Sequence, residues 1–291
     1  MTAFARGGGD EVRQLCVPFK TEVNLLSDKE IMDCKEGLEE SFDSLADDVS
    51  QQVFLKTVAY KVTGDYLPLF DYLEIKEPNL GFFDTDLLSK RRDHIYVDVG
   101  AFTGDSLLSF AMAVHGSYKE MVAFEGDKGI YESLLNMLTY SRLPNIVAVN
   151  KLLYSGLEEK DWHSIENNKN ILFGSPNLFE KAEVIFSSGE AASSGPVNFV
   201  TEKVHTDTLD NCLRVNPTVL KINAMGADFD ILQGGKEIIG RCRPMLCLEF
   251  GVRMHDVGRL IPLIKSISPK YRFYLRVKEI YGDFKTVLYA V

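Results

Sequence analysis

Short apolar runs rich in β-branched residues alternate with segments of helical spacing along the chain after residue 93. The runs lie at residues 94–99, 121–125, 145–150, 218–223, 245–250, 272–277 and 286–291. Connections of helix length or longer separate the first five runs, and only parallel strands with crossovers need such connections. The last two runs are joined by a short connection containing Gly282 and Asp283, which predicts an antiparallel hairpin at one edge. The pattern therefore predicts a doubly wound α/β sheet of seven strands.

The chain before residue 93 has a helical pattern. Ser27 and Glu30 are spaced as in a capping box, and Gly64 is placed to end a later helix. Apolar residues recur near the helical period at Val53, Leu55, Val58, Ala59 and Val62. We expect an N-terminal tail and helical accessory region over residues 1–92 and a main domain over residues 93–291. Residues 155–200 are polar and punctuated by glycine, and we expect a long loop or insertion there.

A strand, a glycine turn and a helix follow one another at the start of the main domain. The first run ends in a turn that contains Gly100 and Gly104, and a helical pattern starts directly after it. Such a turn lets a ligand approach the backbone closely and meet the N-terminus of the helix. The second run ends in Glu125, where a carboxylate can accept both hydroxyls of a ribose. Together these features predict a nucleotide-bearing cofactor at the carboxyl ends of the first two strands.

Two kinds of cofactor share this layout. A dinucleotide site favours the spacing G-x-G-x-x-G, whereas here three residues separate Gly100 from Gly104 and Phe102 would crowd a pyrophosphate. Asp98 enters the turn and suits a ligand with a cationic ammonium group, such as the methionine part of S-adenosylmethionine. A purely structural turn that binds no ligand stays the alternative.

Several motifs resemble the FkbM family of S-adenosylmethionine-dependent methyltransferases. They are residues 98–105 (DVGAFTGD), 123–125 (AFE), and 220–228 (LKINAMGAD) with the following Gly234 and Gly235. The similarity continues through residues 243–244, 261–266, 273–276 and 286–290, and extends more weakly to residues 60–65. The resemblance implies the class I methyltransferase (Rossmann-like) fold and O-methylation of sugars and natural products. It also implies that S-adenosylmethionine is held by Asp98, Gly100, Ala101, Phe102, Thr103, Gly104, Ser106, Glu125, Gly126 and Asn223.

The fourth run departs from the family pattern. Where the family has Lys-x-Asp-x-Glu-Gly-Ala-Glu, this chain has Asn223 and Met225 in place of two carboxylates, and only Asp228 stays acidic. The Asn223 amide can hydrogen-bond a ligand, but it cannot take a proton or hold a divalent metal strongly. Asn223 and Asp228 are candidate catalytic residues, and we predict no metal site.

Two other residues are candidates for the missing base. Glu249 ends the fifth run, and ligands bind at the carboxyl ends of parallel strands. His255 follows six residues later and has an ordinary pKa suited to a general base. Each also has a structural interpretation, because Glu249 could pair with Arg253 and His255 could cap a helix that begins near Asp256.

These features predict an S-adenosylmethionine-dependent transferase that methylates a hydroxyl or amine of a small molecule, either a sugar or a natural product. Two alternatives follow from the missing carboxylates. The protein could attack another carbon of the sulfonium, as in aminocarboxypropyl transfer or cyclisation of the cofactor. It could instead be a catalytically silent module that only binds the cofactor.

Composition excludes some partners. Lysine and arginine number 32 and aspartate and glutamate 42, and the resulting net charge of −10 is opposite to what nucleic acid binding requires. No stretch approaches the roughly 18 apolar residues that span a membrane. The five cysteines are widely spaced without a CxxC pair, which fits a cytoplasmic protein without disulfides or structural zinc. We expect the N-terminal helices to lie near the substrate entrance or to form a homodimer interface.

Overall fold

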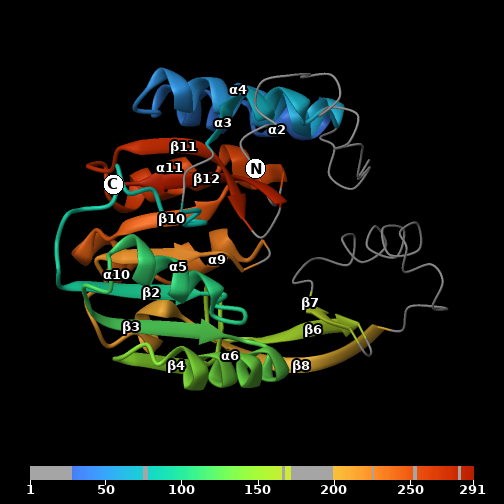
Figure 1. Ribbon diagram of the computed structural model, residues 1–291. Coiled ribbons are helices and arrows are strands. Elements are labelled where there is room, and N and C mark those ends of the chain that lie inside the picture. Colours follow the sequence, from blue (N-terminus) through green and yellow to red (C-terminus); the bar gives the residue numbers. More distant parts are fainter. Residues whose placement is uncertain are drawn as a thin grey trace.

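The computed structural model describes residues 28–74, 78–165, 168–171, 199–224, 226–251, 254–280 and 283–291. Within them, an eight-stranded sheet has the order β1-β11-β12-β10-β9-β2-β3-β4 (Figure 1). Its strands are β1 (Leu73–Glu74), β2 (His94–Val99), β3 (Tyr118–Glu125), β4 (Ile146–Asn150), β9 (Val219–Ile222), β10 (Met245–Glu249), β11 (Phe273–Ile280) and β12 (Asp283–Ala290). The predicted doubly wound α/β sheet is confirmed, and all seven predicted runs form strands of it.

The C-terminal hairpin is antiparallel, as predicted, but its predicted place at an edge is wrong. β12 lies between β10 and β11 and is antiparallel to both. The edge strand is β1, which pairs in parallel with β11 through Leu73 and Val277. β1 is only two residues long. A strand this short has no alternating pattern of its own, so periodicity could not reveal it.

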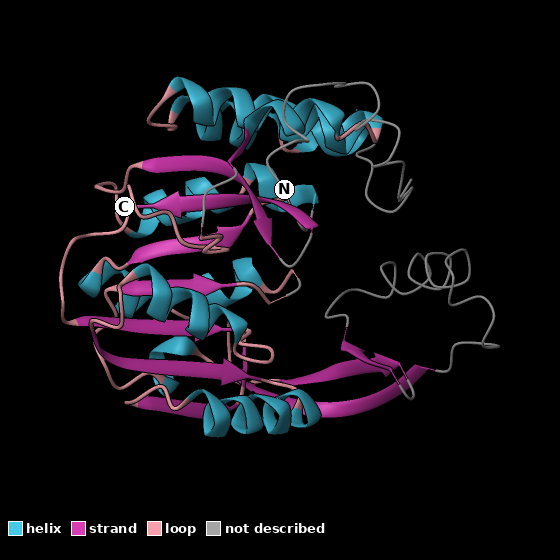
Figure 2. Ribbon diagram, in the orientation of Figure 1, coloured by secondary structure: helices cyan, strands magenta, loops and turns pink. Residues whose placement is uncertain are grey.

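Helices cover both faces of the sheet (Figure 2). α5 (Asp105–Ala113) and α6 (Lys128–Ser141) lie on one face, and α9 (Asp228–Gln233), α10 (Lys236–Cys242) and α11 (Leu260–Ile267) lie on the other. Successive side chains of a strand point to opposite faces of the sheet, so neighbouring residues pack into different hydrophobic cores. Tyr96 of β2 packs with α5, whereas Val97 belongs to the core beneath α9, α10 and α11. α8 (Leu209–Cys212) also packs into this second core.

The N-terminal region forms α2 (Asp28–Asp33), α3 (Lys35–Asp43), α4 (Asp48–Thr63) and the 3₁₀ helix η1 (Leu67–Tyr72). α4 ends at Gly64, which has a left-handed φ of 75° as a helix C-cap requires. The apolar pattern predicted its inward face incompletely: Val53 is buried, but Leu55 and Val62 are 47% and 39% exposed. The buried face of α4 instead carries small polar residues, which form hydrogen bonds with the sheet. Ser50 accepts a hydrogen bond from the Leu275 amide at 3.0 Å.

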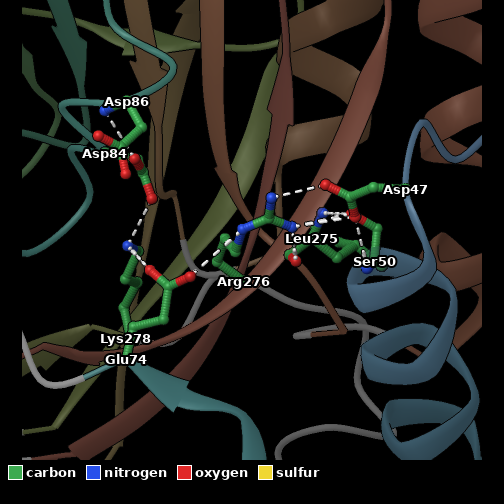
Figure 3. A network of polar contacts seen from close by, with 8 residues as sticks. All are labelled: Asp47, Ser50, Glu74, Asp84, Asp86, Leu275, Arg276 and Lys278. Carbon is green, nitrogen blue, oxygen red and sulfur yellow. Dashed lines mark hydrogen bonds and ion pairs between the residues drawn. The ribbon is translucent and has the colours of Figure 1, made fainter.

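A network of charged residues joins this region to β11 (Figure 3). Arg276 Nη2 lies 2.7 Å from Asp47 Oδ2, at the start of α4, and Arg276 Nε lies 3.3 Å from Glu74 Oε1 of β1. Lys278 bonds to Glu74 and, at 2.8 Å, to the buried carboxylate of Asp84. The N-terminal helices are thereby fixed to the strand whose edge they cover.

Of the loop or insertion expected at residues 155–200, the parts that the structure describes form an insertion built from strands. β6 (Glu159–Ile165) pairs antiparallel with β8 (Phe199–Asp207), and β7 (Asn168–Ile171) and β5 (Leu152–Leu153) complete a second, four-stranded sheet. β6 and β8 extend past the end of the main sheet (Figure 1). Polar residues dominate these strands, so hydrophobic alternation did not reveal them. Residues 172–198 lie outside the described residues.

Candidate active site

The turn after β2 depends on two glycines. Gly100 has a φ of 74°, and an added Cβ would lie 2.1 Å from the carbonyl oxygen of Asn223. Gly104 has a φ of 90°, and an added Cβ would lie 1.9 Å from Met137 Cε on α6. At Gly100 a left-handed backbone and a close approach to main chain both require glycine, whereas at Gly104 the left-handed φ is the main requirement, because Met137 Cε is the end of a flexible side chain. The turn therefore lies tightly against the end of β9 on one side and α6 on the other.

Glu125, at the end of β3, holds the middle of this turn. Its Oε2 accepts the Phe102 amide and its Oε1 accepts the Asp127 amide, each at 2.9 Å. Burial raises the pKa of Glu125, and the two amides partly oppose that shift. Phe102 has a φ of 49° and a side chain that is 48% exposed. Each carboxylate oxygen keeps a second lone pair, so Glu125 can still accept from a ligand.

Three further predicted cofactor residues lie around the same turn. Ala101 is fully buried, and its amide bonds to the backbone of β3 at 3.0 Å. Thr103 is half-buried in the turn. Gly126 follows Glu125, and an added Cβ there would lie 2.7 Å from Leu152 Cδ1. The structure thus brings the predicted residues from both strand ends together.

Asp98 lies beneath the turn in a closed polar network. It is fully buried, and its Oδ2 accepts from Ser106 Oγ and, at 2.9 Å, from Tyr96 Oη. Lys221, its register partner on β9, donates to Asp98 Oδ1 at 2.8 Å and to the Gly100 carbonyl at 2.7 Å. The buried ammonium therefore ties the turn to the fourth predicted strand.

Two oxygens beside the turn are buried but have no hydrogen-bond partner among the described residues. One is Oδ1 of Asn223, whose backbone amide bonds to Val99 at 3.0 Å. The other is Oδ2 of Asp105, the first residue of α5. Burial raises the pKa of Asp105, Asp98 raises it further, and Lys221 lowers it.

Asp228 begins α9 near the end of β9. It is 2% exposed and accepts hydrogen bonds from the amides of Gly226 at 3.1 Å and Ala224 at 3.4 Å. Burial, assisted by the charge of Glu249, raises the pKa of Asp228 to about 6. It is therefore a carboxylate whose protonation changes near neutral pH.

Glu249, at the end of β10, pairs with Lys285 of β12 at 3.0 Å. The partner that the sequence suggested, Arg253, lies outside the described residues. Lys61 of α4 approaches the same strand end, with its Cε 3.4 Å from the Cβ position of Gly251. Burial lowers the pKa of Lys61 to about 8, while Glu249 acts in the opposite direction. Nothing in the sequence indicated Lys61 or Lys285, because both lie far from Glu249 along the chain and belong to no motif that includes it.

The remaining candidates are less fully described. His255 lies in the 3₁₀ helix η3 (Met254–Gly258), but its side chain is outside the described part, as is the whole of Met225. Where the structure describes the chain, no group of three or more histidine, cysteine or acidic side chains could hold a metal ion. No helix among the described residues is long and apolar enough to cross a membrane.

The strand order and the site together define a class of protein. Five parallel strands carry a glycine turn and an acidic residue on their first two carboxyl ends, and an antiparallel strand is inserted beside the fifth. This is the arrangement of the class I methyltransferase fold. Residues 98–273 match the model of the methyltransferase FkbM domain, and the chain belongs to this family.

One solved structure shares the fold of this chain. The methyltransferase FkbM from Methylobacillus flagellatus KT has 19% sequence identity and a TM-score of 0.68, and the match covers 90% of this chain but 60% of that protein. The chain thus spans less than two thirds of that relative. A precorrin-6y C5,15-methyltransferase from Geobacter metallireducens GS-15 has 10% identity and a TM-score of 0.38, covering 68% of this chain and 80% of that one. The second resemblance is too distant to extend the assignment. No curated protein matches.

Proposed function

We propose that this protein transfers a methyl group from S-adenosylmethionine to a hydroxyl or amine of a small molecule. Its family and fold support methyl transfer from this cofactor in general terms. The observation that carries the proposal is the glycine turn of residues 100–104, held against Glu125 with unsatisfied oxygens of Asn223 and Asp105 beside it. Buried acceptors without donors are rare in folded proteins, and a cofactor with hydroxyl and ammonium donors would satisfy them.

The residues present fit such a cofactor. Glu125 would accept from the ribose hydroxyls, and the backbone of Gly100 and Gly104 would allow the close approach of the ligand. The exposed ring of Phe102 would lie against it, since an aromatic face attracts a cation. When bound, S-adenosylmethionine supplies a methyl group on a positively charged sulfur. The protein would contribute chiefly by aligning the acceptor atom with that methyl group.

The acceptor would bind at the carboxyl ends of β9 and β10, where Asp228 and Glu249 lie. Asp228 is the better candidate for receiving the acceptor's proton, because its pKa of about 6 is nearer to neutral pH. Glu249 is already paired with Lys285 and would bind a polar group of the acceptor instead. The family resemblance makes the hydroxyl of a sugar or natural product the first acceptor class to test.

The test is incubation with S-adenosylmethionine and a panel of hydroxyl and amine acceptors, followed by mass analysis. We expect S-adenosylhomocysteine together with an acceptor that is heavier by one methylene unit. Methylthioadenosine in place of S-adenosylhomocysteine would overturn the proposal in favour of chemistry at the aminopropyl chain. Unchanged cofactor that binds tightly but reacts with no acceptor would favour a silent binding module.

A further inference from the structure

The last turns of α4 lie against the carboxyl end of β10. Gly251 comes two residues after Glu249, and an added Cβ at Gly251 would lie 3.4 Å from both Thr57 Cγ2 and Lys61 Cε. Thr57 and Lys61 are one helical turn apart, so they approach the strand end from the same side of the helix. The N-terminal region thereby places a lysine beside the strand end at which we propose that the acceptor binds.

A second lysine reaches the same strand end from β12. Thr57 Oγ1 and Thr286 Oγ1 are 3.2 Å apart, and this hydrogen bond ties α4 to β12. Lys285 precedes Thr286, and its Nζ lies 3.0 Å from Glu249 Oε1. The charges of Glu249 and Lys285 both act on Lys61, so the three side chains form one electrostatic cluster.

Within this cluster, the ammonium of Lys61 lacks a carboxylate of its own. Lys285 already pairs with Glu249, and Lys61 forms no hydrogen bond or ion pair with a described residue. Its Nζ lies 4.8 Å from the centroid of the Tyr60 ring. Burial lowers the pKa of Lys61 to about 8, as expected of a half-buried ammonium without a counter-ion. Lys285 is 28% exposed and Glu249 12%, so a ligand from solvent can reach the cluster.

We propose that the acceptor carries an anionic group, either a carboxylate or a phosphate, which binds to the ammonium of Lys61 beside the Glu249–Lys285 pair. The inference rests on the proposed function, which puts the acceptor at this strand end. An anion supplies both the missing counter-ion and oxygens that accept from the ammonium, whereas a neutral hydroxyl leaves the charge uncompensated. Lys285 adds to the attraction, because the two lysines share a single carboxylate. The acceptor class is then a hydroxylated acid, such as a sugar acid or a sugar phosphate.

NMR of the lysine side chains tests this binding, with and without S-adenosylhomocysteine. The ε-methylene signal of Lys61 is identified by its absence in Lys61→Met. The probes are methyl glucuronide, glucose 6-phosphate and the neutral methyl glucoside. We expect each anion to raise the pKa of Lys61, because an anion stabilises the charged ammonium. Each anion should bind about tenfold more weakly to Lys61→Met, and methyl glucoside should leave the pKa unchanged.

Two variants serve as controls. Lys56→Met removes another lysine of α4 and should leave binding of the anions unchanged. Lys61→Arg keeps the positive charge and should retain most of the binding. An ammonium of Lys61 whose pKa neither anion moves would overturn the proposal. A pKa that S-adenosylhomocysteine raises, with no further effect of the anions, would also overturn it, because Lys61 would then serve the carboxylate of the cofactor.

Failure of this inference is distinguishable from failure of the proposed function. Methyl transfer to neutral acceptors, without any response of Lys61 to the anions, would leave the proposed function intact. A protein that neither binds S-adenosylhomocysteine nor methylates any acceptor would fail the proposed function, whatever the response of Lys61.

Discussion

Lys221 shows how one side chain organises the site. Its ammonium bonds to both Asp98 and the Gly100 carbonyl, so it neutralises a buried charge and fixes the glycine turn. The sequence identified the turn and Asp98 from their order along the chain. It could not identify the ion pair, because Asp98 and Lys221 become neighbours only through the register of β2 and β9. Pairing between strands far apart in sequence is a property of the sheet and not of either strand.

Replacing Lys221 with methionine should therefore destabilise the whole protein. The variant leaves Asp98 buried without its cation, and we expect the free energy of unfolding to fall by about 3–5 kcal/mol. Urea denaturation followed by circular dichroism measures this change. A loss below about 1 kcal/mol would indicate that the carboxylate is neutral or solvated in the folded protein.

Asp228 should make the free energy of unfolding fall as pH rises, which is opposite to the usual effect of a carboxylate. Its pKa is raised from 3.8 to about 6, so the folded protein holds a proton that the unfolded chain releases between these values. Stability of the unaltered protein therefore falls as pH rises through this window, and the penalty is complete above it. Asp228→Asn removes this titration. Its stability relative to the unaltered protein should rise by up to about 3 kcal/mol between pH 4 and pH 7.

Denaturation curves at several pH values provide the measurement, with Asp43→Asn on the exposed face of α3 as the charge-matched control. A relative stability of Asp228→Asn that stays constant with pH would show that Asp228 is not perturbed in the folded state.

At the scale of elements, close backbone packing helps to position α3, in addition to the apolar contacts of Leu38 and Phe42. An added Cβ at Gly37 would lie 2.0 Å from the carbonyl oxygen of Gly258 in η3, which is main chain and cannot move aside easily. The helical pattern of the N-terminal region was predictable from its caps and spacing. The inward faces were predictable only in part, because apolar residues such as Val53 are joined there by a glycine of α3 and by Ser50 and Thr57 of α4, which give no apolar signal.

Gly37→Ala should reverse the usual effect of this substitution. In an unobstructed helix, alanine is more favourable than glycine by about 0.5–1 kcal/mol. Here the clash with η3 should instead destabilise the protein by about 1–3 kcal/mol, measured by thermal or urea denaturation. Gly156→Ala, where nothing lies within 4 Å of an added Cβ, is the matched control and should change little. Stabilisation by Gly37→Ala would contradict the observed contact between α3 and η3.

At the scale of the whole molecule, the sheet is the part that sequence predicts best. Seven of its strands coincide with apolar runs, and β2, β9 and β10, which are buried along almost their whole length, give the clearest signal. The second sheet was missed because its β6 strand, with the sequence EKDWHSI, is mostly polar. The site was also predictable only in part. The residues of the glycine turn follow one another in the sequence and could be identified from it. Lys61, Lys285 and Glu249 come together only when α4, β12 and β10 assemble, so the sequence does not reveal their contacts.

We propose that the turn after β2 is a binding site for S-adenosylmethionine. Calorimetric titration of the protein with S-adenosylhomocysteine, repeated with NAD and with the variant Gly100→Ala, tests it most directly. We expect S-adenosylhomocysteine to bind at a single site and NAD not to compete. Gly100→Ala should abolish binding, because its Cβ would lie 2.1 Å from the Asn223 carbonyl oxygen and disrupt the turn. Tighter binding of NAD, or binding of S-adenosylhomocysteine that Gly100→Ala leaves intact, would contradict the assignment of the cofactor to this turn.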